Sequence, residues 1–172
     1  DGNRVSPHFI IAATDFSDVS ALAVQQAWQL ATQRDDAELH VVHAIDDRRG
    51  GASRQAELER EAELLEQTPK ALRNHAIAQA QARQLAPLPR PLGVHVRLGE
   101  PARAILQLAA DLDAALVVVG SHGRSGLGKL VLGSVSEALV KAGRLPVLVS
   151  RPKALVDMAR SERLAPPCPA CV

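Results

Sequence analysis

Residues 116–142, LVVVGSHGRSGLGKLVLGSVSEALVKA, decide the fold class of this chain of 172 residues. The stretch begins with Leu-Val-Val-Val, an apolar run typical of a strand that is buried on both faces. A loop rich in glycine and serine follows, and the spacing behind it predicts a helix over 134–142 that ends at Gly143. A buried strand that leads through such a loop into a helix indicates the α/β class.

Strands and helices alternate on both sides of this stretch. The sequence predicts strands over 8–14, 38–45, 93–98, 116–119 and 145–150, and helices over 19–34, 68–86, 102–112 and 134–142. Because the predicted strands are apolar on both faces, this alternation favours a parallel sheet with right-handed crossovers and helices on its faces. Ligands of such sheets bind outside the carboxyl ends of the strands, where the strand order reverses.

One domain is expected over residues 1–152. A chain of this length buries about two-thirds of its unfolded surface, so it needs neither disulfides nor a structural metal. The segment 47–67 is rich in charged residues and is predicted to be an exposed, mobile insert. Thr68–Pro69 behind it is predicted to restart the helix, since proline is tolerated at the first helical position.

The only two cysteines, Cys168 and Cys171, lie in a C-terminal tail, residues 153–172. The body of the domain therefore contains no thiol, which suits a cytoplasmic protein. A Cys-x-x-Cys pair supplies half of a zinc site. We interpret the segment as a tail, with a zinc site shared by the two tails of a dimer as the alternative.

The charge balance and the aromatic content argue against several classes of partner. Lys and Arg number 20 and Asp and Glu 19, which leaves a net charge of +1 and no basic stripe for a nucleic-acid backbone. Phe9, Phe16 and Trp28 are the only aromatic residues, too few to stack single-stranded bases. The longest apolar run, 114–119, is too short to cross a membrane, and no leader sequence is visible. We therefore expect a small-molecule ligand, with neither nucleic acid nor a membrane as partner.

The loop 120–133 has the features of a phosphate site. Five glycines in these fourteen positions leave backbone N–H groups open to an anion. The helix behind the loop adds the N–H groups and the dipole of its first turn. Ser134 and Glu137 have the spacing of a capping box, so Ser134 is expected to cap this helix, to bond a phosphate oxygen, or to exchange between the two.

Two better-known phosphate motifs fit this loop poorly. Gly123 to Lys129 has the spacing G-x-x-x-x-G-K, but Leu130 stands where a P-loop needs Ser or Thr for Mg²⁺. A dinucleotide pattern that starts at Gly126 reaches Val131 in place of its third glycine, and it follows the fourth strand rather than the first. Neither a P-loop enzyme nor a Rossmann dehydrogenase is favoured.

Gly120-x-x-Gly123, followed by nine residues and then Gly133-Ser134, is an arrangement in which this sequence resembles the universal stress protein family, its ATP-binding branch in particular. The resemblance extends to Ala13–Ser17 and His43–Asp46 at two strand ends and to Pro146–Val149 in the last strand. It implies an open five-stranded parallel sheet in the order 3-2-1-4-5, a Rossmann-like fold related to the adenine nucleotide alpha hydrolases. ATP would lie across the carboxyl ends of the first and fourth strands.

The resemblance, which covers about residues 5–152, also implies roles around that nucleotide. Asp15 would lie near the adenine or the ribose, Ala44 would line the base pocket, and residues 119–120 would meet the ribose and the first phosphate. The ion that accompanies ATP would be Mg²⁺ or Mn²⁺. The family often has proline at position 13 and a larger apolar residue at position 44, so the two alanines here bear on the fit of the base. The candidate nucleotide-binding residues are Ala13, Thr14, Asp15, Ala44, Val119, Gly120, Gly123, Arg124, Gly133, Ser134, Val135 and Ser136.

Several residues keep a second interpretation. Asp15 has the side chain of an N-cap for the first helix, and Arg124 is either a phosphate ligand or a solvated loop residue. No Ser/His/Asp grouping is assignable around His122, so a role in loop structure is favoured. His40 and His43 stand three apart on one strand and therefore point to opposite faces, which excludes a metal site made by these two alone.

These observations predict a protein that binds an adenine nucleotide and acts in a stress response through a nucleotide-dependent dimer or partner. The family resemblance suggests that two chains pair along the strand 146–150, which would be a sheet edge. No carboxylate is placed to activate water, so any ATP hydrolysis is expected to be slow. The alternatives are a slow ATP hydrolase or nucleotidyl-transfer enzyme on the same fold, and a dimeric interaction module that binds no nucleotide.

Overall fold

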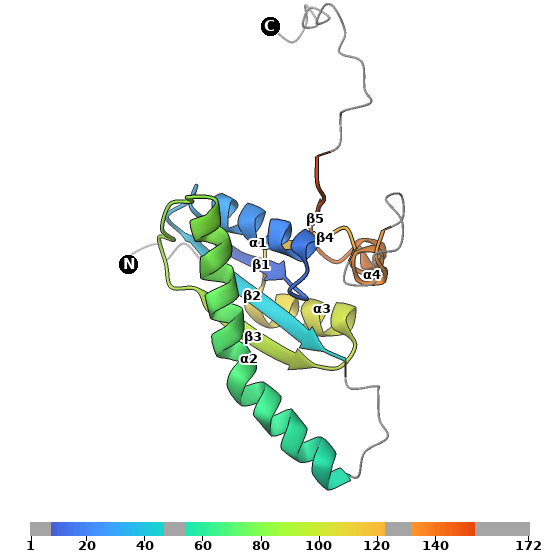
Figure 1. The fold of residues 1–172 in the computed structure, drawn as a ribbon. Coiled ribbons are helices and arrows are strands. Elements are labelled where there is room, and N and C mark those ends of the chain that lie inside the picture. Colours follow the sequence, from blue (N-terminus) through green and yellow to red (C-terminus); the bar gives the residue numbers. More distant parts are fainter. Residues whose placement is uncertain (1–7, 47–53, 123–131, 154–172) are drawn as a thin grey trace, which may run out of the picture.

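The structure is a computed structural model that describes residues 8–46, 54–122 and 132–153 (Figure 1). The cysteines of the tail and the loop residues Gly123 and Arg124 lie outside these described residues. The elements in chain order are β1 (His8–Ala13), α1 (Asp18–Ala31), β2 (Ala37–Ile45), α2 (Arg54–Ala82), β3 (Gly93–Leu98), α3 (Pro101–Leu112), β4 (Leu116–Gly120), α4 (Ser134–Ala142) and β5 (Val147–Ser150).

The strands form one open parallel sheet in the order β3-β2-β1-β4-β5. The predicted fold class and strand order are therefore confirmed. β1 pairs with β2 on one side and with β4 on the other, so the strand order reverses between β1 and β4. β5 lies at one edge of the sheet, as expected for the strand 146–150.

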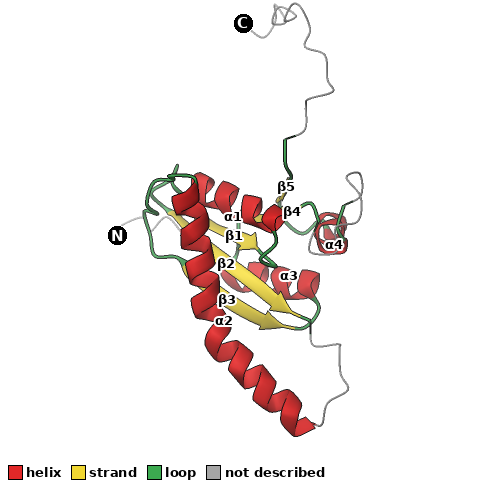
Figure 2. Cartoon of the chain, viewed as in Figure 1, coloured by secondary structure: helices red, strands yellow, loops and turns green. Residues whose placement is uncertain are grey.

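Helices cover both faces of the sheet and give the domain three layers (Figure 2). α1 and α2 enclose one core with residues such as Ile10 and Leu39, and α3 and α4 enclose the other with residues such as Ile11 and Val42. Neighbouring residues of one strand thus enter opposite cores. This is why the central strands are apolar throughout rather than at alternate positions.

The predicted restart at Thr68–Pro69 is wrong, because α2 runs without a break from Arg54 to Ala82 with Pro69 inside it. Proline removes one backbone N–H, whereas the Ala, Glu, Leu and Gln residues around it are strong helix formers. Leu72 and Ala76 are fully buried, and they pack the second half of the helix against the core. The first half extends beyond the sheet (Figure 1), so the predicted insert is helical from residue 54 onward.

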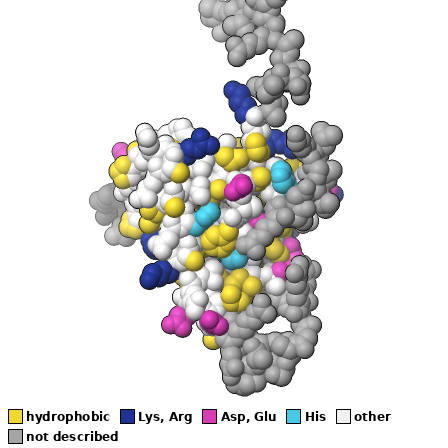
Figure 3. All heavy atoms as spheres, in the orientation of Figure 1, with side chains coloured by type: hydrophobic (Ala, Val, Ile, Leu, Met, Phe, Trp, Pro, Cys, Tyr) yellow, Lys and Arg dark blue, Asp and Glu magenta, His cyan; other side chains and the backbone are white. Residues whose placement is uncertain are grey.

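On the face drawn in Figure 3, the Lys and Arg side chains of the described residues are scattered rather than gathered in one patch. These described side chains form no continuous stripe for a nucleic-acid backbone on that face. In the described part of the chain, none of the helices combines the length and the apolar character needed to cross a membrane.

Candidate functional site

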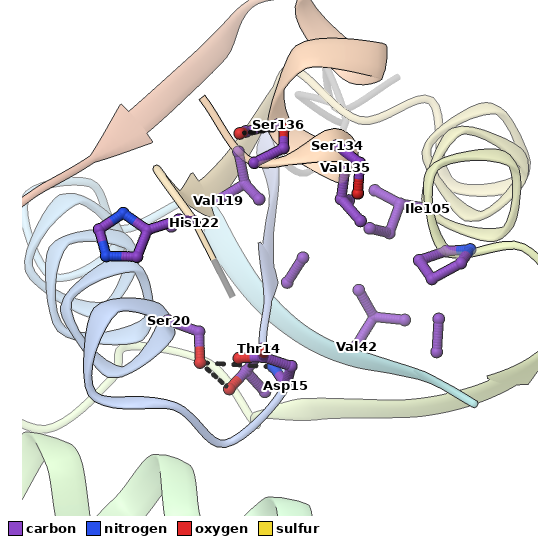
Figure 4. A pocket seen from close by; sticks show the side chains of 15 residues that line it. Thr14, Asp15, Ser20, Val42, Ile105, Val119, His122, Ser134, Val135 and Ser136 are labelled. Carbon is purple, nitrogen blue, oxygen red and sulfur yellow. Dashed lines mark hydrogen bonds between the residues drawn. The ribbon is translucent and has the colours of Figure 1, made fainter. Parts of the chain in front are cut away.

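A pocket of about 330 Å³ opens at the carboxyl ends of β1 and β4, where the strand order reverses (Figure 4). Pockets of this size accept small organic ligands. Strands β1, β2 and β4 contribute their ends, and helices α1, α3 and α4 contribute their first turns. The lining residues are Ala13, Thr14, Asp15, Ser20, Val42, Ala44, Pro101, Ile105, Val119, Gly120, His122, Gly133, Ser134, Val135 and Ser136.

Ten of the twelve candidate residues named from the sequence line this one pocket. They come from four separate stretches of the chain, which the parallel sheet brings together at one edge. The remaining two, Gly123 and Arg124, lie outside the described residues. Polar groups lie on two sides of the pocket, at Thr14–Asp15 and at the start of α4, and Val42 and Ile105 lie along the wall that joins them (Figure 4).

The turn between β1 and α1 is held by a network of hydroxyl groups. Ser20 Oγ donates to Ser17 O at 2.9 Å and accepts from Asp15 N–H at 3.3 Å. Since its proton is used, the 2.9 Å contact between Thr14 Oγ1 and Ser20 Oγ has the threonine as donor. Thr14 Oγ1 in turn accepts from Phe16 N–H at 3.0 Å. Each hydroxyl proton has an acceptor, so the wall formed by Thr14 and Ser20 is held in place.

Asp15 is not the N-cap of α1. The N-cap is Ser17, whose hydroxyl accepts from Ser20 N–H at 3.3 Å. Asp15 stands two residues before this N-cap. Its carboxylate accepts hydrogen bonds from the backbone N–H and the hydroxyl of Ser17, at 3.1 and 2.6 Å. It therefore supports the capping serine and lines the pocket at the same time. The sequence alone did not show whether Asp15 or Ser17 caps α1, because Asp and Ser are both favoured N-cap residues.

The start of α4 also differs from the prediction. Gly133 is the N-cap and Ser134 is the first helical residue, so the expected capping box with Glu137 does not form. Glycine has no side chain to accept a hydrogen bond, and among the described residues no side chain caps this helix. The N–H groups of its first turn consequently keep the capacity to bind an anion.

Ser136, one of the candidate nucleotide-binding residues, turns its hydroxyl into the protein. It is almost completely buried, and Oγ donates to Gly133 O at 2.9 Å and Ser121 O at 3.2 Å. Gly133 N–H donates to the same Ser121 carbonyl at 2.6 Å. These bonds attach the start of α4 to the end of β4, so the hydroxyl of Ser136 has a structural role.

Gly120 has a packing role that sequence reasoning did not assign. A β carbon at this position would lie 3.1 Å from the backbone N of Ser20 and from the backbone C and O of Val19. Contacts of this length are tighter than most β carbons make, and the neighbours that would have to shift are helix backbone atoms. Gly120 therefore allows the first turn of α1 to approach the end of β4.

Five lining residues were not among the candidates: Ser20, Val42, Pro101, Ile105 and His122. Val42 was accessible to sequence reasoning, because it lies two residues before Ala44 on the same strand and hence on the same face. His122 was expected to have a loop role, and its Nδ1 lies 3.0 Å from Ser121 Oγ. Pro101 and Ile105 carry no such signal, since their place depends on how α3 docks on the sheet.

The histidines of β2 point to opposite faces, as predicted. His40 contacts Phe9 and His95, whereas His43 contacts Phe16 and donates from Nδ1 to Thr14 O at 2.8 Å. Within the described residues, no group of three or more His, Cys, Asp or Glu side chains has a metal-binding arrangement.

Comparison with known proteins gives the same fold and family. The model of the universal stress protein family matches residues 8–151. Universal stress protein Rv2005c of Mycobacterium tuberculosis (strain ATCC 25618 / H37Rv) is 37% identical over 147 residues, which are 83% of this chain and 45% of that protein. The chain thus spans about half the length of this relative and of two other mycobacterial relatives with the same identity.

Solved structures agree with the sequence matches. The structure of the protein MJ0577, from Methanocaldococcus jannaschii, has a TM-score of 0.69 at 26% identity and covers 87% of this chain and 99% of that chain. A universal stress protein in complex with cAMP has a TM-score of 0.55 at 25% identity and covers 85% of this chain and 98% of that chain. The match of the family model to residues 8–151, which are most of the chain, shows that this chain belongs to the universal stress protein family.

Proposed function

We propose that this chain binds an adenine nucleotide in the pocket at the carboxyl ends of β1 and β4. The observation that carries the proposal is the convergence of ten residues, named from the sequence alone, on that pocket. The Thr14–Asp15 side offers oxygen atoms to a ribose or a base, the apolar wall fits a planar ring, and the uncapped start of α4 fits a phosphate. One structural relative at 25% identity is a complex with cAMP, an adenine nucleotide.

ATP is the nucleotide that we propose for the complete site, with Gly123 and Arg124 of the loop contributing to its phosphate end. The glycine-rich loop supplies more backbone N–H groups than one phosphate requires. Mg²⁺ or Mn²⁺ would bind to the phosphates of ATP, since these hard cations prefer oxygen ligands. Positive charge near the phosphates would then come from the ion, the α4 dipole and Arg124.

The role proposed for this binding is regulatory. Nucleotide would alter a homodimer formed along the β5 edge, or a partner bound there, as part of a stress response in the cytoplasm. Leu148 at this edge is 37% exposed, and a free apolar edge favours pairing with another strand. The loop proposed to contact phosphate joins β4 to α4, so it lies one helix away from β5 in the chain.

The proposal is tested by finding the nucleotide and then removing its site. Purified protein is denatured, released nucleotide is identified by chromatography, and refolded protein is titrated with AMP, cAMP and ATP plus Mg²⁺ by calorimetry. The Gly133→Val variant is expected to fold, because Gly133 has φ −65° and ψ 153°, a conformation that valine adopts readily. Its side chain would obstruct the start of α4 and abolish nucleotide binding.

Val140→Ala is the matched control, since Val140 lies on the same helix but is 47% exposed. We expect it to bind nucleotide as the wild type does. Wild-type affinity in a folded Gly133→Val variant would place the phosphate elsewhere. Absence of binding for all three nucleotides would reject the proposed function and leave the interaction module as the working hypothesis.

A further inference from the structure

We propose that His43 is a positioning residue, which fixes the Thr14–Asp15 turn of the pocket from the opposite face of the sheet. The inference rests on the proposed function, because the turn that His43 holds is the one assigned to the nucleotide. His43 does not line the pocket, so it acts through Thr14 rather than on the ligand.

The placement of His43 follows from the alternation along β2. Val42 and Ala44 line the pocket, and the side chain between them lies on the other face, towards α1 and α2. From there His43 Nδ1 lies 2.8 Å from Thr14 O. A carbonyl oxygen only accepts, so Nδ1 carries the proton and donates it. Thr14 N–H donates to Val42 O at 3.0 Å, which means that β2 holds both sides of this residue.

The same ring supports a strained residue in the turn. Phe16 has φ +65°, a conformation that bulky side chains rarely adopt. Its ring packs edge-on against His43 and His75, with centroid distances of 4.9 and 5.1 Å, and its N–H bonds to Thr14 Oγ1 at 3.0 Å. His43 therefore contacts the turn twice, by a hydrogen bond to Thr14 and by ring packing against Phe16.

Of these two contacts, the hydrogen bond from His43 to Thr14 O is the one that fixes the backbone beside the pocket. Thr14 is 5% exposed, so its carbonyl oxygen would remain buried without a donor if the bond were removed. A buried acceptor without a partner is unfavourable enough to shift the local backbone. Asp15 follows directly, and its carboxylate would move with that backbone. The ring contact, in contrast, supports Phe16, which points away from the pocket and does not line it.

Two substitutions separate these contacts. His43→Asn keeps an N–H donor at the position of Nδ1 and removes the ring, whereas His43→Phe keeps a ring and removes the donor. The AMP dissociation constant is measured by calorimetry. We expect His43→Asn to remain within about threefold of the wild type, and His43→Phe to bind AMP about 10- to 100-fold more weakly, the range for leaving a buried acceptor unpaired.

A second readout uses the protein without ligand. Exchange of the Phe16 and Ser17 amide hydrogens, which bond to Thr14 Oγ1 and Asp15 Oδ1, is followed by NMR. We expect faster exchange in His43→Phe and nearly wild-type exchange in His43→Asn. If the wild type binds none of the nucleotides, the proposed function fails, and this measurement still decides whether His43 holds the turn.

Further variants separate the loss of the hydrogen-bond donor from the loss of ring packing. His75→Phe changes the other ring beside Phe16 without touching Thr14, and it should leave AMP affinity unchanged. If His43→Phe does not fold, His43→Leu removes the donor with a smaller side chain. Normal affinity and exchange in the variants without a donor would overturn the proposal, as would equal loss in His43→Asn and His43→Phe, because ring packing would then explain the effect.

Discussion

Gly120 and Gly133 both line the pocket, but they differ in what the surrounding structure says about an added side chain. A β carbon at Gly120 would stand 3.1 Å from backbone atoms of α1, which move only if the helix moves. At Gly133 the backbone angles, φ −65° and ψ 153°, suit any residue. Close packing therefore accounts for the glycine at position 120, whereas the backbone conformation at position 133 does not by itself call for glycine.

Gly120→Ala is expected to lower the free energy of unfolding by about 1 to 3 kcal/mol, because the added methyl group overpacks the contact between β4 and α1. The measurement is urea denaturation followed by circular dichroism. Gly133→Ser is the control, and its stability should equal or slightly exceed that of the wild type, since serine is a favoured N-cap. Wild-type stability of Gly120→Ala would show that α1 yields without cost at this point.

Three helices begin at the pocket, and their first turns are satisfied in different ways. α1 is capped by the Ser17 hydroxyl, and α3 by the Glu100 carboxylate, which accepts from Ala102 N–H at 3.0 Å and Arg103 N–H at 2.7 Å. α4 begins at Ser134 behind the N-cap Gly133, and no side chain in the described part of the chain caps it. At the scale of the element, α4 is thus the helix whose N–H groups remain suited to an anionic ligand.

Gly133→Asp should change stability and affinity in opposite directions. A carboxylate at the N-cap would bond the first-turn N–H groups and interact favourably with the helix dipole, raising the free energy of unfolding by about 0.5 to 1 kcal/mol. The same carboxylate would occupy the phosphate position and repel it, so AMP affinity should fall at least tenfold. Thermal unfolding and calorimetry measure the two effects. Unchanged affinity would mean that α4 does not hold the phosphate.

The molecule contains a group of half-buried titratable side chains outside the pocket, where β2 pairs with β3. His40 Nδ1 lies 2.7 Å from His95 Nε2, and the two rings stack with centroids 5.0 Å apart. Gly93 stands opposite His40 in the register, and a β carbon there would overlap the His40 ring. In the described part of the chain, the Nε2 atoms of His40 and His75 are buried without a hydrogen bond, and a Glu38 carboxylate oxygen lies 3.8 Å from that of His40.

Stability should therefore fall in mild acid. Burial, and then the charges of His40 and Arg97, lower the pKa of His95 to about 4, and burial also lowers the pKa of His40 and of His75. The unfolded chain takes up protons near pH 6.5, whereas the folded chain resists them. The free energy of unfolding is thus highest above pH 6.5 and declines towards pH 4.

His95 alone should account for about 1 to 3 kcal/mol of this decline, after allowance for solvent around a half-buried ring. Urea denaturation at intervals between pH 7.5 and pH 4 measures it. His95→Phe should give a shallower decline over the same interval than the wild type. A slope unchanged by this substitution would show that other groups cause the acid sensitivity.

Assembly is also a property of the whole molecule. If two chains pair along β5, Leu148→Asp should convert the dimer to a monomer in analytical ultracentrifugation, because the substitution places charge on the free apolar edge. Ile77→Asp is a matched control, since Ile77 and Leu148 are both 37% exposed and Ile77 lies on α2. A dimer that survives Leu148→Asp but not Ile77→Asp would place the interface on α2.

Local sequence patterns were sufficient for the element order and for several element ends. β3 at Gly93–Leu98 and α4 at Ser134–Ala142 have the predicted bounds, and Gly143 ends α4 with φ 57°. Apolar runs, caps and terminal glycines act within a few residues, so they can be read from the sequence alone. The strand order and the residues of the pocket came from the family resemblance, which draws on separated motifs at strand ends.

The sequence by itself thus determined the α/β class, the succession of strands and helices, and the strand ends that meet at the pocket. Only the tertiary structure decided that Pro101 and Ile105 of α3 complete the pocket, that Gly120 makes room for α1, and that His43 bonds to Thr14. The physical reason is distance along the chain. Contacts between remote segments depend on how helices dock on the sheet, and the packing energy of that docking exceeds the preferences of single residues.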